Sequence, residues 1–174
     1  QNKIISIGLS PINNIVDITN YILHDIGQPL HAFDYDKIED QTIKVKKYKK
    51  EIKFKTLDEI ERTLSSNDLT ISDSKKPLCL AGIFGGIDSG ISKKTTSIFL
   101  ESAYFDPITV RKSAKHHNLS TDSSYRFERG VDPNISKYAL KRAVLMIKEV
   151  CKDSIVSSDL IDLYPKPIKD IQIV

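Results

Sequence analysis

The chain has 174 residues, of which 40% are hydrophobic and 28% are charged, and its formal net charge at pH 7 is +3. This length predicts one domain with a core of its own, and the composition is ordinary for a globular protein. No apolar run approaches the length of a membrane span, no basic-then-apolar leader opens the chain, and the charge is too mild to establish a nucleic-acid partner.

The first element that the sequence predicts is a helix. Ser10-Pro11 is typical of an N-cap followed by proline at the first helical position, and apolar residues follow at helical spacing as far as Ile26. Gly27 is the expected stop, and Pro29 prevents continuation. We expect this corner, which leads into an extended run, to hold a polar cluster of Thr19, Asn20 and His31.

Residues 43–80 follow a different period. Apolar residues alternate with lysines at Ile43 and Val45 and at Ile52 and Phe54, and similar short runs follow at 69–71 and 78–80. Polar turns at 65–68 and 73–76 separate these runs. The pattern predicts short, hairpin-connected strands in a largely antiparallel sheet system.

Seven lysines lie within residues 44–55, and they allow two interpretations. The one we favour is a solvated hairpin whose lysines protect an edge strand. The other is a patch that faces phosphates.

Four glycines, at positions 82, 85, 86 and 90, fall within nine residues. They match neither GxxxxGK(S/T) nor GxGxxG, two glycine motifs that bind phosphates, and no convincing helix follows them directly. Close approach of a ligand to bare backbone and plain turn geometry are equally good explanations.

The second half predicts a strand at 97–100 that ends at Glu101, a helix from Asp106-Pro107 to about His117, and a polar loop from Ser120 to Arg129. Asp132-Pro133 is expected to start the last long helix, a further strand is expected at 155–161, and a linker is expected to begin at Pro165.

Two side chains in these predicted elements have more than one interpretation. A carboxylate at a strand end usually leaves the core for water, but Glu101 could also recognise the hydroxyl of a ligand. His31 could be a ligand, a base or a core residue, and the sequence alone favours the core.

Other chemistries have little support. His24, His116 and His117 have no metal-ligand spacing, and the last two are expected to interact with the helix dipole. There is no GxSxG elbow. Cys79 and Cys151 match no zinc or CxxC spacing, so we expect buried free thiols in a reducing cytoplasm.

Five segments recur in the same order in one family. The chain resembles the editing domain, the third and fourth modules, of the bacterial-type phenylalanyl-tRNA synthetase beta subunit. The similarity runs from about Ser10 to Ala143 and rests on residues 16–21 (VDITNY), 27–34 (GQPLHAFD), 80–86 (LAGIFGG), 100–107 (LESAYFDP) and 125–133 (YRFERGVDP).

The resemblance implies an α+β fold with antiparallel or mixed β-sheets in a sandwich-like core and helices packed outside. It implies a single editing domain over residues 1–164, excised from a longer subunit, with 165–174 starting the linker to the next module. The implied activity is hydrolysis of tyrosine wrongly esterified to the phenylalanine tRNA.

The resemblance also implies roles for residues. Glu101 would read the tyrosine hydroxyl, and Gly82 and Ser123 would line the substrate pocket with Asn20. His31, Thr19 and Thr121 would lie near the ester, where His31 would orient water or act as a base. The family usually has alanine at Ser123, and a turn glycine is common at Glu59.

The implied partners are the tyrosine-bearing 3′ end of tRNA(Phe) and the alpha subunit, in a heterotetramer of two alpha and two beta subunits. No membrane partner is implied. Editing would need no cofactor and no metal, whereas ATP and Mg²⁺ would serve the full synthetase elsewhere. The competing hypothesis is a non-catalytic tRNA-binding or subunit-interaction module, supported by the lysine cluster and by the basic last helix (Lys137, Lys141, Arg142, Lys148).

Overall fold

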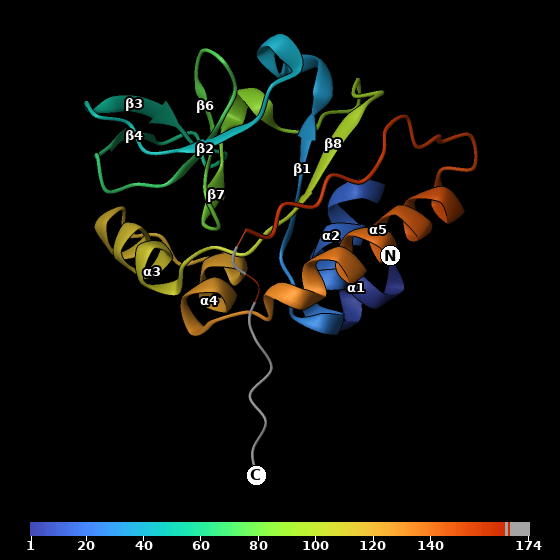
Figure 1. Cartoon of the computed structure of the whole chain (residues 1–174). Helices are drawn as coiled ribbons and strands as arrows, with labels where there is room; N and C mark the ends of the chain where they lie inside the picture. Colours follow the sequence, from blue (N-terminus) through green and yellow to red (C-terminus); the bar gives the residue numbers. More distant parts are fainter. Residues whose placement is uncertain (166, 168–174) are drawn as a thin grey trace.

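The computed structural model describes residues 1–165 and 167, and it has an α+β architecture. In Figure 1 the strands β2–β7 lie at one end of the molecule and the helices at the other, and the long β1–β8 ribbon runs between them. The three sheets are antiparallel throughout. The predicted α+β class with antiparallel sheets is therefore confirmed.

The N-terminal helix α2 (Asn14–Ile26) starts later than predicted. Its N-cap is Asn13 and not Ser10, because the Asn13 side chain accepts hydrogen bonds from the backbone amides of Ile15 and Val16. Gly27 ends the helix at a φ of 77°, as predicted. A short helix that the sequence did not predict, α1 (Asn2–Ser6), precedes it.

A first hydrophobic cluster joins α2 to α5 (Ser136–Val150) and to the strands β1 and β8. Its buried members are Ile18, Ile22, Ala139, Ala143 and Ile147. The alanines allow the two helices to approach closely, and Leu30 and Leu100 of the ribbon pack against them. This cluster fixes β1 (Leu30–Asp34) and β8 (Ile98–Ser102) against the helical end.

The four-stranded sheet has the order β2-β5-β6-β7, with β2 (Lys44–Lys46) at its edge. Its other strands are β5 (Thr70–Ser72), β6 (Pro77–Leu80) and β7 (Phe84–Gly85), and β3 (Ile52–Lys55) pairs separately with β4 (Glu61–Leu64). The lysines of β2 thus lie on an edge strand as predicted. The prediction that residues 44–55 form one hairpin was wrong, because β2 pairs with β5 and β3 pairs with β4.

A second hydrophobic cluster fills the sheet end, with Phe33, Leu64, Leu78, Leu80 and Val110 almost inaccessible to solvent. Val110 comes from α3 (Pro107–His116), whose N-cap is Asp106 as predicted. Short 3₁₀ turns connect the strands at Tyr35–Lys37, Glu39–Gln41 and Ile87–Ser89.

The predicted loop at 120–129 was wrong. Residues Asp122–Arg129 form a helix, α4, which starts at a reciprocal capping box. The Ser124 amide donates to the Thr121 hydroxyl, and the Ser124 hydroxyl accepts from the Thr121 amide. The last helix begins with a 3₁₀ turn, Pro133–Ile135, which Asp132 caps.

The segment 155–161 contains no strand, so that prediction was wrong as well. Of the predicted linker at 165–174, only residues 165 and 167 are described. Within the described residues, none of the helices is both long and apolar enough to cross a membrane.

Candidate functional site

The register of the β1–β8 ribbon places His31 directly opposite Glu101. Side chains directly opposite each other in an antiparallel pair lie on the same face. Both residues line one pocket of about 240 Å³. This volume corresponds to roughly eight water molecules at about 30 Å³ each, which is comparable with an aromatic amino-acid side chain.

The pocket brings together six of the seven site residues that the sequence analysis named. They come from α2 (Asn20), β1 (His31), the 82–85 loop (Gly82), β8 (Glu101) and the start of α4 (Thr121, Ser123). Thr19 does not line the pocket. It is buried, and its hydroxyl donates to the Val16 carbonyl one turn back in α2.

His31 is uncharged at neutral pH. Burial lowers its pKa from 6.5 to about 4, because an apolar surrounding disfavours the charged imidazolium. The ring packs edge-on against Phe33 at 4.4 Å between centroids. Among the described residues its Nε2 atom is buried and has no hydrogen-bond partner.

Glu101 is also uncharged at neutral pH. Burial raises the pKa of its carboxyl from 4.5 to about 8, again because the apolar surrounding disfavours the charged form. A protonated carboxyl can both donate and accept a hydrogen bond. In this state Glu101 can act as donor or as acceptor toward the hydroxyl of a ligand.

Two of the clustered glycines shape the pocket directly. Gly82 has a φ of 71°, and a Cβ atom there would lie 2.9 Å from both Phe105 and Phe127, which form an edge-to-face pair on the pocket wall. A Cβ at Gly85 would lie 3.0 Å from the His31 ring. The positive φ of Gly82 supports the explanation by turn geometry, and the close contacts there are with core side chains, while Gly85 allows close approach to His31. Close approach of a ligand to this backbone stays a prediction.

The remaining polar residues of the wall differ in availability. The Thr121 hydroxyl donates to the Ile83 carbonyl at 2.9 Å and accepts from the Ser124 amide, so it ties α4 to the glycine loop. In the described part of the chain, the side chains of Asn20 and Ser123 make no hydrogen bond. These two can therefore serve as donors to a ligand.

The sequence analysis did not identify Cys79, Leu57, Phe105 and Phe127 as pocket residues. Burial raises the pKa of the Cys79 thiol well above its usual value, and its sulfur contacts the Leu80 and Phe84 carbonyls. A protonated thiol is a poor nucleophile, which argues against cysteine chemistry here. No local pattern marks these residues, because the chain assembles them from four separate segments.

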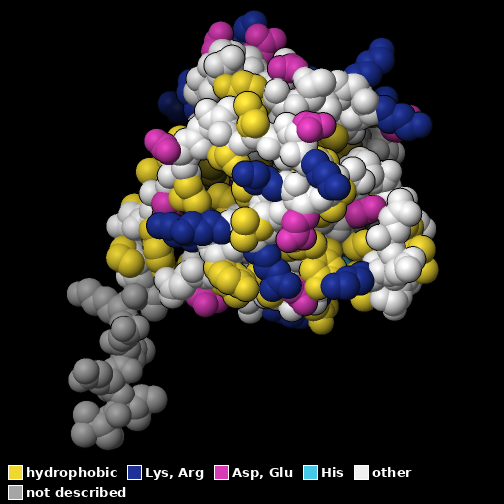
Figure 2. Space-filling model, turned by 90° about the vertical axis from the view of Figure 1, so that its right-hand side faces the viewer, with side chains coloured by type: hydrophobic (Ala, Val, Ile, Leu, Met, Phe, Trp, Pro, Cys, Tyr) yellow, Lys and Arg dark blue, Asp and Glu magenta, His cyan; other side chains and the backbone are white. Residues whose placement is uncertain are grey.

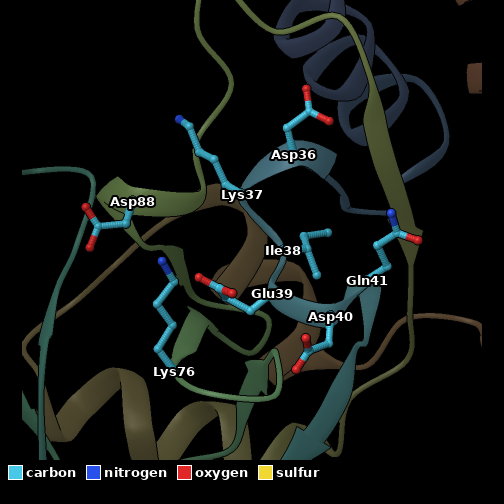
Figure 3. A pocket seen from close by; sticks show the side chains of 8 residues that line it. All are labelled: Asp36, Lys37, Ile38, Glu39, Asp40, Gln41, Lys76 and Asp88. Atoms are coloured by element: carbon cyan, nitrogen blue, oxygen red, sulfur yellow. The ribbon is translucent and has the colours of Figure 1, made fainter.

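A larger hollow of about 660 Å³ lies elsewhere, around the 3₁₀ turns at 35–41. Its lining is mostly charged, and in Figure 3 the side chains point in different directions and do not converge. Glu39 already pairs with Lys75 at 2.8 Å, and Lys37 donates to the Gly90 carbonyl. We therefore place the site in the smaller, more apolar pocket.

Asp68, His116 and His117 lie close enough together to surround a cation. However, Asp68 already accepts hydrogen bonds from Ser113, from Ser65 and from His117. These bonds hold the pKa of the Asp68 carboxyl below its usual value despite the opposing effect of burial. We interpret the group as a brace between α3 and the β4–β5 turn.

Comparison with known proteins identifies the family of the chain. The B3/4 domain family matches residues 1–152. The chain is 52% identical over 170 residues to the phenylalanine--tRNA ligase beta subunit of Bacteroides fragilis. The aligned segment covers 98% of this chain and 21% of that protein. The same subunit of Porphyromonas gingivalis is 49% identical over 97% of this chain and 20% of its own length. The chain thus spans about a fifth of the length of these curated relatives.

The fold and the pocket define an α+β domain with a small pocket, a candidate ligand site, whose wall includes one uncharged acid and one uncharged histidine. The chain belongs to the B3/4 domain family and is homologous to that domain in phenylalanyl-tRNA synthetase beta subunits.

Proposed function

We propose that this chain hydrolyses the ester of tyrosine that has been wrongly attached to phenylalanine tRNA. Its relatives are beta subunits of phenylalanine--tRNA ligase. Tyrosine differs from phenylalanine by one hydroxyl, and an apolar pocket rejects such an analogue only about a hundredfold. A second site that recognises the hydroxyl would supply the missing discrimination.

Glu101 is the observation that carries this proposal. It is an uncharged carboxyl in a pocket whose wall includes Leu57, Phe105 and Phe127. A phenol hydroxyl would form hydrogen bonds with this carboxyl. A phenylalanine ring would leave it unpaired, at a cost of about 1–3 kcal/mol, so tyrosine would be favoured.

His31 would act by positioning water. A histidine whose pKa is about 4 is a weak base at pH 7. Its unpartnered Nε2 atom could instead hold a water molecule in line with the ester carbonyl. The Asn20 amide and the Ser123 hydroxyl, which line the same pocket, could then stabilise the developing oxyanion.

We propose the cellular setting and the partners that the resemblance implied, but no role at the ester for Thr19, because Thr19 does not line the pocket. The chain would work in the cytoplasm as part of a longer beta subunit, with an alpha subunit and tRNA as partners. Ester hydrolysis would need no cofactor.

The test is deacylation of tyrosyl-tRNA and phenylalanyl-tRNA by the wild type, Glu101→Ala and Glu101→Gln. We expect the wild type to prefer the tyrosyl ester, Glu101→Ala to lose about 5- to 100-fold of that preference, and Glu101→Gln to retain part of it. An unchanged ratio of the two rates in Glu101→Ala would contradict the role of Glu101.

The alternative is a non-catalytic tRNA-binding module, which would bind charged and uncharged tRNA equally. The helix α5 gives it little support. Arg142 pairs with Asp25 at 2.5 Å and Lys137 with Asp162 at 3.5 Å. Figure 2 shows Lys and Arg interspersed with acidic and apolar side chains on the face it displays, and not gathered into one patch.

A further inference from the structure

The helix α4 carries an exposed aromatic residue close to the mouth of the pocket. Asp122 and Ser123, in its first turn, line the pocket, and Tyr125 lies three residues after Asp122. Residues three apart in a helix are neighbours on its surface, with about 5–6 Å between their Cβ atoms. Tyr125 is 48% exposed.

Arg129 holds Tyr125 in a defined arrangement. Its guanidinium lies 3.5 Å from the centroid of the Tyr125 ring. The same guanidinium donates to the Tyr125 carbonyl at 3.1 Å and pairs with Glu128 at 2.6 Å. Since these bonds fix the long side chain, the pair presents a preformed flat surface, and Arg126 adds a positive charge 5.7 Å from the ring.

Flat aromatic and guanidinium surfaces next to positive charge are what unpaired nucleobases stack on in single-stranded RNA. We propose that the Tyr125–Arg129 pair is a stacking platform for an unpaired nucleotide of the substrate RNA. This inference rests on the proposed function, in which the tyrosine side chain occupies the pocket and the terminal adenosine of the tRNA lies outside it. The nucleotide on the platform is then the one that precedes the terminal adenosine.

Tyr138 on α5 provides a matched control. It is 56% exposed and has an arginine, Arg142, four residues later, as Tyr125 has Arg129. It does not line the pocket. A general effect of removing an exposed tyrosine beside an arginine would appear at both positions, whereas stacking of the substrate would appear at Tyr125 alone.

The experiment measures binding first, so that it does not depend on catalysis. An RNA oligonucleotide with the sequence of the tRNA 3′ end carries a fluorescent base analogue at the next-to-last position. We expect Tyr125→Ala to weaken binding by about tenfold or more, as base stacking on an aromatic side chain predicts. Tyr125→Phe, which keeps the ring, and Tyr138→Ala should bind as the wild type does.

Hydrolysis then separates this inference from the proposed function. Tyr125→Ala should raise KM for tyrosyl-tRNA and leave hydrolysis of tyrosine esterified to adenosine alone unchanged. If the wild type hydrolyses neither substrate, the proposed function fails, while the binding assay still decides the platform. The platform is overturned if the wild type does not bind the oligonucleotide, or if Tyr125→Ala and Tyr138→Ala bind it equally.

Discussion

One environment removes the charge from both His31 and Glu101. The pKa of the imidazole falls to about 4 and that of the carboxyl rises to about 8, and burial is the cause in each case. Opposite shifts follow because an apolar surrounding disfavours a cation and an anion alike. Between these two values both side chains are neutral, so they can interact with an uncharged amino-acid side chain and an ester without a charge to compensate.

We predict that His31→Ala lowers kcat for tyrosyl-ester hydrolysis by about 10- to 100-fold, as expected when a positioned reactant is lost. The fold should persist, because the His31 Nε2 atom has no partner in the described structure to leave behind. Single-turnover deacylation, together with circular dichroism, measures both effects. His116→Ala, at an exposed histidine of α3, is the control. Unchanged deacylation in His31→Ala would refute the role of His31.

For single residues, the sequence could predict which ones lie at the site but not whether their side chains are charged. The sequence predicted that Glu101 ends an apolar strand, and that pattern favoured a carboxylate facing water, with recognition of a ligand hydroxyl as the alternative. In the structure the strand continues to Ser102 and Glu101 lines the pocket. Its protonation depends on the glycine loop and on β1, which pack around it from distant parts of the chain. Thr19 shows the converse, because its place beside Asn20 in the sequence does not bring it into the pocket.

Among the elements, α4 shows why a short polar helix is difficult to predict. Its eight residues include one buried aromatic, Phe127, and most of the others are polar, so no apolar run marks the helix. The capping box uses Ser124 where glutamate or glutamine is usual. The Thr121 hydroxyl nevertheless starts the helix and ties it to the Ile83 carbonyl, and this contact positions Ser123 at the pocket.

The glycine loop supports a stability prediction. Gly82→Ala should lower the free energy of unfolding by about 2–4 kcal/mol, because a residue with a Cβ is strained at positive φ and the added methyl overpacks the core. Its nearest neighbours would be Phe105 and Phe127, at 2.9 Å. Urea denaturation gives the value.

Gly27→Ala is the matched control for this prediction. Gly27 has a similar φ, 77°, in the left-handed region, but nothing lies within 4 Å of the position of its Cβ. It should lose only the backbone contribution, about 1–2 kcal/mol. Equal losses in the two variants would show that packing at Gly82 contributes nothing.

The turn between β3 and β4 supports a prediction of the opposite sign. Glu59 has a φ of 63°, in the left-handed region that favours glycine. Glu59→Gly should raise the free energy of unfolding by up to about 1 kcal/mol, since relief of strain outweighs the entropy that glycine loses on folding. Glu59→Ala keeps the Cβ atom and should give no gain in a thermal melt. An equal gain in both variants would point to loss of the carboxylate as the cause.

At the scale of the whole molecule, the pocket lies where the two hydrophobic clusters meet. The β1–β8 ribbon contributes Leu30 and Leu100 to the helical cluster and Phe33 to the sheet cluster. Sequence patterns identified both strands, but the pairing joins residues about seventy positions apart, and its register could not be read from either strand alone. That register places His31 opposite Glu101.

The pH dependence of global stability follows from the same two groups. For His31, a folded pKa of about 4 below the usual 6.5 means that stability is lost as pH falls from 6.5 toward 4. For Glu101, a folded pKa of about 8 above the usual 4.5 means that stability is lost as pH rises from 4.5 toward 8. Between pH 6.5 and 8, Glu101 therefore makes the larger contribution to the pH dependence of stability.

We therefore predict that the wild type loses stability with rising pH across this window. Taken as the difference between the wild type and Glu101→Gln, which cannot titrate at this position, the slope should be about 1.4 kcal/mol per pH unit near pH 6.5 and about half of that at pH 8, because the folded wild type retains one proton that its unfolded state has released. The opposing contribution of His31 near pH 6.5 is common to both proteins and cancels in this difference. Urea denaturation at pH 6.5, 7.2 and 8.0 compares the two proteins. Parallel profiles would mean that Glu101 is already ionised in the folded protein at pH 7, and its proposed role as an uncharged partner of the tyrosine hydroxyl would have to be abandoned.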